Sequence, residues 1–135
     1  MANGKTTNEG ANKAATDYIA ARTYYLGLYE NATEPLKTAS LSAGDITEVT
    51  GAGYARIILN GGSWSVDSTG KATNLEKTFT ASGTWSNPVT GSFLTNVASG
   101  TGGILDHVHH SPVGDMTVLS GKDVKITPEI QVEYV

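Results

Sequence analysis

The chain has 135 residues, enough for one domain with one ordinary core. Only 16% of the residues are charged and the formal net charge is −4 at pH 7, which argues against the concentrated basic face that nucleic-acid binding needs. There is no cysteine, so disulfides, thiolate metal sites and cysteine nucleophiles are excluded.

Neither a membrane span nor a secretion signal is expected from the sequence. The chain contains no run of about 18 apolar residues. Its first residues, MANGKTTNEGANKAATDYIAAR, lack the apolar segment of a signal peptide. We therefore expect a soluble protein made in a cytoplasm, wherever it finally resides.

The N-terminal segment predicts a short helix. The sequence is Ala-rich from about Asn8 to Arg22, and its apolar positions follow helical spacing. Most of this narrow stripe is methyl groups, too little to hold a helix by itself. We therefore expect residues 1–22 to form an attachment arm whose stripe contacts a partner; the stripe is made by Ala11, Ala14, Ala15, Tyr18 and Ile19.

The rest of the chain, residues 23–135, predicts a single β-sandwich or jelly-roll domain. Short alternating segments are separated by turns rich in Gly, Asn and Pro, and no helices come between them. Residues 30–45 and 67–74 are expected to be loops. The expected extended segments are 23–29, 46–50, 51–59, 60–66, 75–81, 84–88, 91–98, 104–110, 115–119, 120–126 and, most clearly alternating, 129–135.

All three histidines lie in ILDHVHHSPVG, residues 104–114. On a strand, Leu105, His107 and His109 would share one face, with the two imidazoles about 7 Å apart at Cα. They supply two ligands where zinc normally needs three or four, so a polar strand face is favoured over a metal site within one chain.

No sequence motif indicates catalysis or phosphate binding. There is no G-x-S-x-G elbow, and GTGGIL lacks the spacing of a dinucleotide loop. No cofactor is expected. Arg56 lies among apolar residues in GYARIIL and needs a carboxylate or carbonyl partner if it is covered; Glu48 and Asp45 are near in sequence.

The order of several segments resembles a group of small bacteriophage virion proteins, often labelled tail fibre or structural proteins. The segments are TYYLGLYE, ITEVTGAGYARIIL, NLEKTF, GTW, SGTGGIL and VLSGKDVKITPEIQVEYV, and together they cover roughly residues 22–135. The chain departs from the group's pattern at Phe79-Thr80, where Phe-Pro is usual, and at Gly121-Lys122-Asp123, where Gly-Asp is usual. The matching residues are Glu48, Val49, Gly53, Tyr54, Arg56, Asn74, Phe79, Trp85, Gly102, Gly103, Leu105 and Gly121.

The resemblance implies a protein of the virion without enzymatic activity. It implies structural roles for Tyr54, Arg56, Gly102 and Gly103, and binding to the major capsid protein or other virion subunits. A capsid decoration or cement protein is the favoured form, and a tail or tail-fibre component in host adsorption is the alternative. Apart from the resemblance, a carbohydrate-binding or hydrolytic domain is the third possibility. Trp64, Trp85 and the tyrosines could form a sugar platform, but burial in the core explains these aromatic residues equally well.

Proteins of this kind are often trimers, which gives the histidines a second interpretation. At a three-fold axis His107 and His109 would bring six imidazoles together, enough for an octahedral transition-metal ion, as in phage fibres and spikes that this arrangement resembles. Without metal, clustered imidazoles would repel one another when they charge at about pH 6–6.5.

Overall fold

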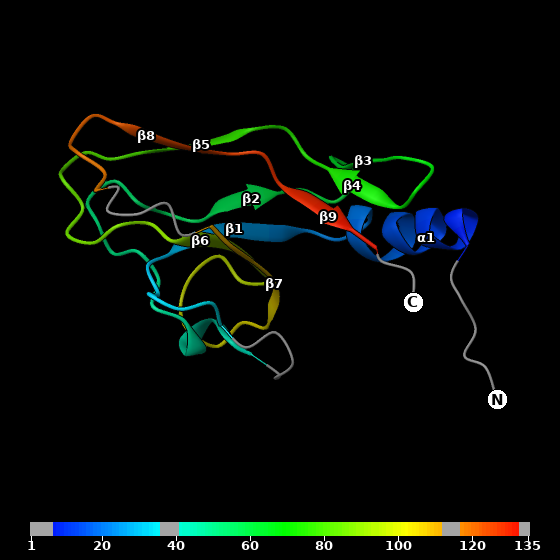
Figure 1. Ribbon diagram of the computed structural model, residues 1–135, viewed down its shortest axis with the longest axis horizontal. Helices are drawn as coiled ribbons and strands as arrows, with labels where there is room; N and C mark the ends of the chain where they lie inside the picture. Colours follow the sequence, from blue (N-terminus) through cyan, green and yellow to red (C-terminus); the bar gives the residue numbers. More distant parts are fainter. Residues whose placement is uncertain (1–6, 36–40, 112–116, 133–135) are drawn as a thin grey trace. The chain divides into compact units, whose positions relative to one another are not determined.

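The structure is a computed structural model and describes residues 7–35, 41–111 and 117–132. Within these residues it is mostly β, with one short N-terminal helix followed by nine strands in three sheets (Figure 1). The prediction of a β-rich chain with a short N-terminal helix is confirmed. The strands are β1 (Tyr24–Tyr29), β2 (Ile57–Leu59), β3 (Ser65–Val66), β4 (Lys71–Thr73), β5 (Lys77–Thr80), β6 (Gly91–Thr95), β7 (Leu105–His110), β8 (Asp123–Ile126) and β9 (Glu129–Gln131).

The chain divides into two compact units. Unit 1 contains the described residues up to Thr23, the segment Leu59–Lys77 and the described residues from Ile126. Unit 2 contains Tyr24–Ile58 and Thr78–Lys125. The division into an arm, residues 1–22, and a single domain, residues 23–135, stays a prediction. None of the helices in the described ranges could cross a membrane.

Unit 1 combines the helix with the three-stranded sheet β3-β4-β9. The helix begins as α1 (Asn8–Ala14), where the Thr7 hydroxyl caps the amide of Gly10, and continues as the π-helix η1 (Ala15–Ala20). It packs closely against the β3–β4 turn, because a Cβ atom on Gly70 would lie 2.7 Å from the Cβ of Ala11. The helix thus buries Ala11, Ala15 and Ala20 within unit 1.

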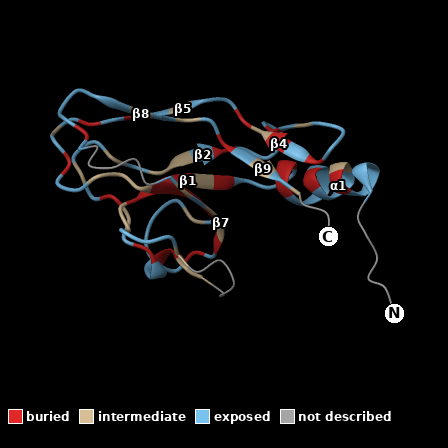
Figure 2. Cartoon of the chain, viewed as in Figure 1, coloured by how far each residue is buried: buried red, intermediate tan, exposed pale blue. Residues whose placement is uncertain are grey.

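Unit 2 is built around the four-stranded sheet β2-β1-β6-β7. The central strand β1 pairs antiparallel with β6, Leu26 opposite Leu94 and Leu28 opposite Ser92. Nearly all of β1 is buried, as Figure 2 shows. On one side of the sheet Phe93 packs with Tyr29, Ile46 and Leu105. The strands β5 and β8 form a separate two-stranded sheet.

Three expected segments differ from the structure. Residues 67–74, expected to be a loop, contain β4, because the turn needs only residues 67–70, where the Asp67 carboxylate accepts the amides of Thr69 and Lys71. Residues 84–88 form no strand, although Trp85 is buried and its amide donates to the carbonyl of Val118. Thr117–Leu119 form no strand either, and positions 115 and 116 lie outside the described residues.

Candidate functional site

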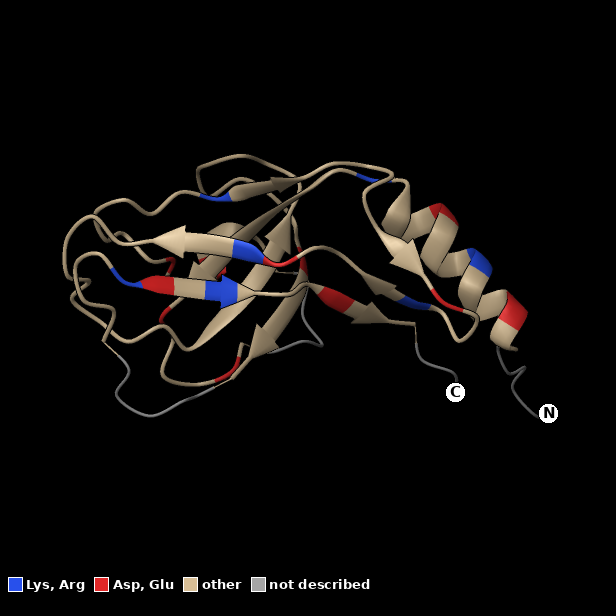
Figure 3. Ribbon diagram, turned by 90° about the horizontal axis from the view of Figure 1, so that it is seen from above, with Lys and Arg blue, Asp and Glu red and all other residues tan. Residues whose placement is uncertain are grey.

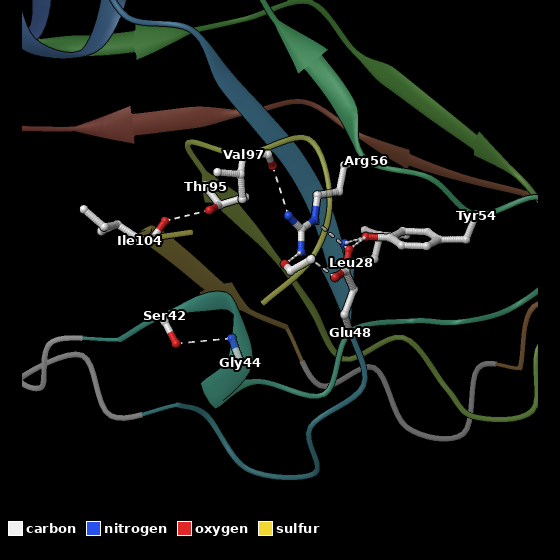
Figure 4. A network of polar contacts seen from close by, with 10 residues as sticks. Leu28, Ser42, Gly44, Glu48, Tyr54, Arg56, Thr95, Val97 and Ile104 are labelled. Carbon is white, nitrogen blue, oxygen red and sulfur yellow. Dashed lines mark hydrogen bonds and ion pairs between the residues drawn. The ribbon is translucent and has the colours of Figure 1, made fainter. Parts of the chain in front are cut away.

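A polar network in unit 2 centres on Arg56 and Glu48 (Figure 4). Arg56 Nε donates to Glu48 Oε1 at 2.8 Å and Nη2 donates to Oε2 at 2.6 Å, so the guanidinium binds the carboxylate in a bidentate ion pair. The Arg56 side chain is only 2% exposed and that of Glu48 is 24% exposed. This is the carboxylate partner that the apolar surroundings of Arg56 led us to expect.

Arg56 also binds the loop that joins β6 to β7. Its Nη1 donates to the carbonyl of Val97 at 3.0 Å and its Nη2 to the carbonyl of Gly100 at 2.8 Å. Its guanidinium carbon lies 5.3 Å from the centre of the Phe93 ring. One buried side chain thus ties the segment at Glu48, the sheet and the loop together.

Tyr54 extends this network to β1. Its hydroxyl donates to Glu48 Oε1 at 2.7 Å and accepts the amide of Leu28 at 2.9 Å. The Tyr54 ring stacks on Phe79 and meets Trp85 edge to face. Burial, followed by the hydrogen bond to Glu48, raises the pKa of Tyr54 far above that of a free phenol. The phenol is therefore a neutral structural group at physiological pH.

The two adjacent glycines of the loop differ sharply in their surroundings. A Cβ atom on Gly103 would lie 2.3 Å from Val97 Cγ2 and 2.5 Å from Thr95 Oγ1. The Gly103 carbonyl accepts the amide of Ala43, which joins the loop to the segment before Ile46. A Cβ atom on Gly102 would have no neighbouring atom within 4 Å. Gly103 is therefore required by packing in this structure, and Gly102 is not.

The chemistry open to this cluster is limited. Both carboxylate oxygens of Glu48 already accept hydrogen bonds, and the Tyr54 hydroxyl both donates and accepts. The hydrogen bond and charge of Glu48 raise the pKa of Arg56 above its already high value, so Arg56 stays a cation. The arrangement suits a clamp that fixes main-chain segments. The sequence indicated the pair through Glu48 and Arg56, but no local signal pointed to the contact between Tyr54 and Leu28.

The histidines lie on β7, an edge strand of the sheet. His107 is opposite Leu94 and His109 is opposite Ser92, so these two histidines share a face as predicted. The register then shifts at Asp106, and Leu105 pairs with Thr95. The predicted alternation is wrong at Leu105, because this bulge turns its side chain into the core cluster on the opposite face of the sheet.

The three imidazoles have different surroundings. His107 meets Tyr24 edge to face, His110 Nδ1 is hydrogen-bonded to the Tyr29 hydroxyl at 2.9 Å, and His109 is exposed. In the ranges that the structure describes, no three His, Cys, Asp or Glu side chains are grouped so as to hold a metal ion. A metal site shared by His107 and His109 of several chains stays a prediction.

The expected partner-binding stripe on the helix is divided in the structure. Ala11, Ala15 and Ile19 are buried within unit 1, whereas Ala14 and Tyr18 are exposed. The guanidinium of Arg22 lies 4.0 Å from the centre of the Tyr18 ring. Only the second group is accessible to a partner in this conformation.

The tryptophans do not form an open platform. Trp64 is 7% exposed in unit 1 and Trp85 is 1% exposed in unit 2. Sugar stacking would need an accessible indole face, so their burial argues against the carbohydrate-binding interpretation.

No protein-family model, curated protein or solved structure matches the chain.

Proposed function

We propose that the chain is a non-enzymatic structural protein of a bacteriophage virion, a decoration or cement protein that binds the outer capsid lattice. In this proposal the β-rich chain is of the β-sandwich or jelly-roll type, and copies assemble as a homotrimer against the major capsid protein. The protein is made in the host cytoplasm and ends in the virion.

The observation that carries the proposal is where the residues of the virion resemblance lie. Glu48, Tyr54, Arg56, Phe79 and Trp85 are separated in sequence, yet they form one connected network in unit 2. Their polar groups are satisfied by one another and by main-chain atoms. A pattern of this kind supports a shared scaffold, which is what a structural protein needs, and it leaves these groups no role on a substrate.

The charge distribution also supports binding to protein. Basic and acidic positions alternate along the helix and are dispersed over the strands in Figure 3. A lattice contact depends on buried area and on strand or arm addition, and it needs no concentrated charge.

The deciding experiment is the copy number in purified virions. Quantitative mass spectrometry should give hundreds of copies, in a fixed ratio to the major capsid protein of the same digest. A few to a few dozen copies would favour the tail or tail-fibre alternative. Absence from virions would contradict both the decoration and the tail proposals. Light scattering of the pure protein tests separately whether it is a trimer.

A further inference from the structure

The turn between β2 and β3 contains the dipeptide Asn60-Gly61, whose two residues can react with each other. Glycine has no side chain to hinder the approach of its amide nitrogen to the Cγ atom of a preceding asparagine. Asn60 and Gly61 are both exposed. In the described part of the chain Asn60 accepts hydrogen bonds through its main-chain carbonyl, and its carboxamide has no partner. The side chain is therefore available for attack.

The turn requires its glycines but not its asparagine. A Cβ atom on Gly61 would lie 2.7 Å from the carbonyl oxygen of Ala21, and Gly62 has a φ of 86°. In the described ranges no residue other than glycine has a positive φ, so Asn60 has an ordinary backbone conformation. Asn60 contributes to the turn through its carbonyl, which accepts the amide of Ser63. Most other residues could do the same at this position.

Contacts with the C-terminal end of the helix restrain the Gly61 amide, which is the nucleophile. This amide donates to the Thr23 hydroxyl at 3.1 Å, and the amide of Gly62 donates to the carbonyl of Ala20 at 2.7 Å. All of these residues belong to unit 1. Attack on Asn60 requires the Gly61 nitrogen to lose its proton, so the bond to Thr23 must break first. Exposed hydrogen bonds of this kind open locally at low free energy.

We propose that Asn60 is a site of spontaneous deamidation, and that the hydrogen bond from Gly61 to Thr23 restrains the reaction. The inference does not depend on the proposed virion function. The deprotonated Gly61 nitrogen forms a bond to Asn60 Cγ, and the bond from Cγ to Nδ2 breaks with release of ammonia. A five-membered succinimide results. Water then opens this ring at one of its two carbonyl carbons, which gives aspartate or isoaspartate at position 60.

Both products weaken the contact that restrains their formation. Each adds a negative charge to a turn that binds the C-terminal end of the helix, where the helix dipole disfavours negative charge. Isoaspartate also adds one carbon to the main chain, which moves the amides of Gly61 and Gly62 out of register with Thr23 and Ala20. The reaction does not reverse, because ammonia leaves. Modified chains therefore accumulate with weaker attachment of the helix end to unit 1.

Peptide mapping of the full chain during incubation in mildly alkaline buffer tests the site. Trypsin releases residues 57–71, in which Asn60 is the only asparagine, so mass spectrometry reads its conversion directly. Aspartate and isoaspartate should accumulate in the folded chain, more slowly than in the chain unfolded in urea. The control is Asn60→Gln, whose longer side chain would have to close a less favourable six-membered ring. It should fold like the wild type and stay unmodified.

The Thr23 hydroxyl is tested by two substitutions. Thr23→Val removes the acceptor of the Gly61 amide and should raise the rate at Asn60 severalfold, whereas Thr23→Ser keeps the hydroxyl and should keep the wild-type rate. Equal rates in Thr23→Val and the wild type would overturn the proposal. So would an unmodified Asn60 in the folded wild type at a time when the unfolded chain is fully converted.

A second measurement applies if Thr23→Val loses its helical circular dichroism. The wild type is then incubated in increasing concentrations of urea, and the rate at Asn60 is compared with the helical signal. A rate that rises as the helix is lost supports the restraint by Thr23, and a rate independent of urea overturns it.

Discussion

Arg56 holds the carboxylate of Glu48 with two of its nitrogens while its side chain is 2% exposed. Breaking a buried pair leaves a charge without a partner, which costs more than the pair itself contributes. Arg56→Ala should therefore lower the free energy of unfolding by about 3 kcal/mol, measured by urea denaturation. Arg56→Lys should recover little of this loss, because an ammonium cannot reproduce the two-point contact.

The exposed pair of Lys13 and Asp17 provides the matched control for that measurement. Its two side chains are 78% and 60% exposed, and Lys13→Ala should change the urea midpoint very little. An unchanged midpoint in Arg56→Ala, together with lost binding to a virion partner, would instead assign Arg56 to an interface.

Tyr54→Phe tests the contact that the local sequence does not reveal. The substitution keeps the ring between Phe79 and Trp85 but leaves the Leu28 amide without its acceptor. We expect a loss of about 1–3 kcal/mol in unfolding free energy, with faster exchange of the Leu28 amide. Tyr25→Phe is the control, because Tyr25 is also on β1 and is only half-buried. Full protection of the Leu28 amide in Tyr54→Phe would contradict the assignment.

The buried phenols predict sensitivity to alkali. Burial raises the pKa of Tyr29 to about 12 and raises that of Tyr54 further. Their stabilising contribution is complete below about pH 10, where unfolded tyrosine still keeps its proton, and is lost as the pH rises above it. A phenolate absorbance titration should show Tyr29 and Tyr54 ionising well above pH 10, the ordinary pKa of tyrosine. Tyr54→Phe should make the alkaline loss of stability shallower, and an unchanged slope would contradict this.

The adjacent glycines allow a close comparison. Gly103→Ala places a methyl group against Val97 and Thr95 and should cost about 1–3 kcal/mol, whereas Gly102→Ala enters open space and should change stability by less than about 0.5 kcal/mol. Thermal unfolding of the two variants side by side measures the difference. Equal midpoints would show that the loop can move aside.

The helix offers a similar pair of positions. Ala15 is buried within unit 1 and Ala14 is exposed beside it. Ala15→Glu buries a carboxylate without a partner and should unfold unit 1, whereas Ala14→Glu should leave the helical circular dichroism unchanged. Incorporation of Ala14→Glu into virions then reports on partner binding without loss of the fold. Equal helix content in both variants would place the buried face of the helix elsewhere.

Local patterns predicted most of the elements of this chain, because they are set by side-chain periodicity and turn residues. The helix from Asn8, the strand at residues 23–29 and the alternation of Ile130 and Val132 are visible in the sequence, and the structure has them. Tyr134, the next member of that alternation, lies outside the described residues.

Contacts between distant segments could not be predicted from the sequence. The bulge at Asp106 inserts one residue into β7 and turns Leu105 to the other face. No residue type at this position predicts a bulge. The division of the helical stripe into buried and exposed positions follows from the packing of the helix on β3 and β4 within unit 1, which the sequence does not show. The bond from Tyr54 to Leu28 spans 26 residues and follows from the tertiary fold alone.

The way in which Arg56 holds the loop before β7 has a consequence for variation. Arg56 binds main-chain oxygens of Val97 and Gly100, so its contacts do not depend on which side chains the loop carries. Gly100 is constrained by its φ of 84°, but Ala98 and Ser99 between them are exposed. The tip at residues 98–99 is therefore a place where related chains can diversify, or where a short peptide can be displayed, on a base that keeps its shape.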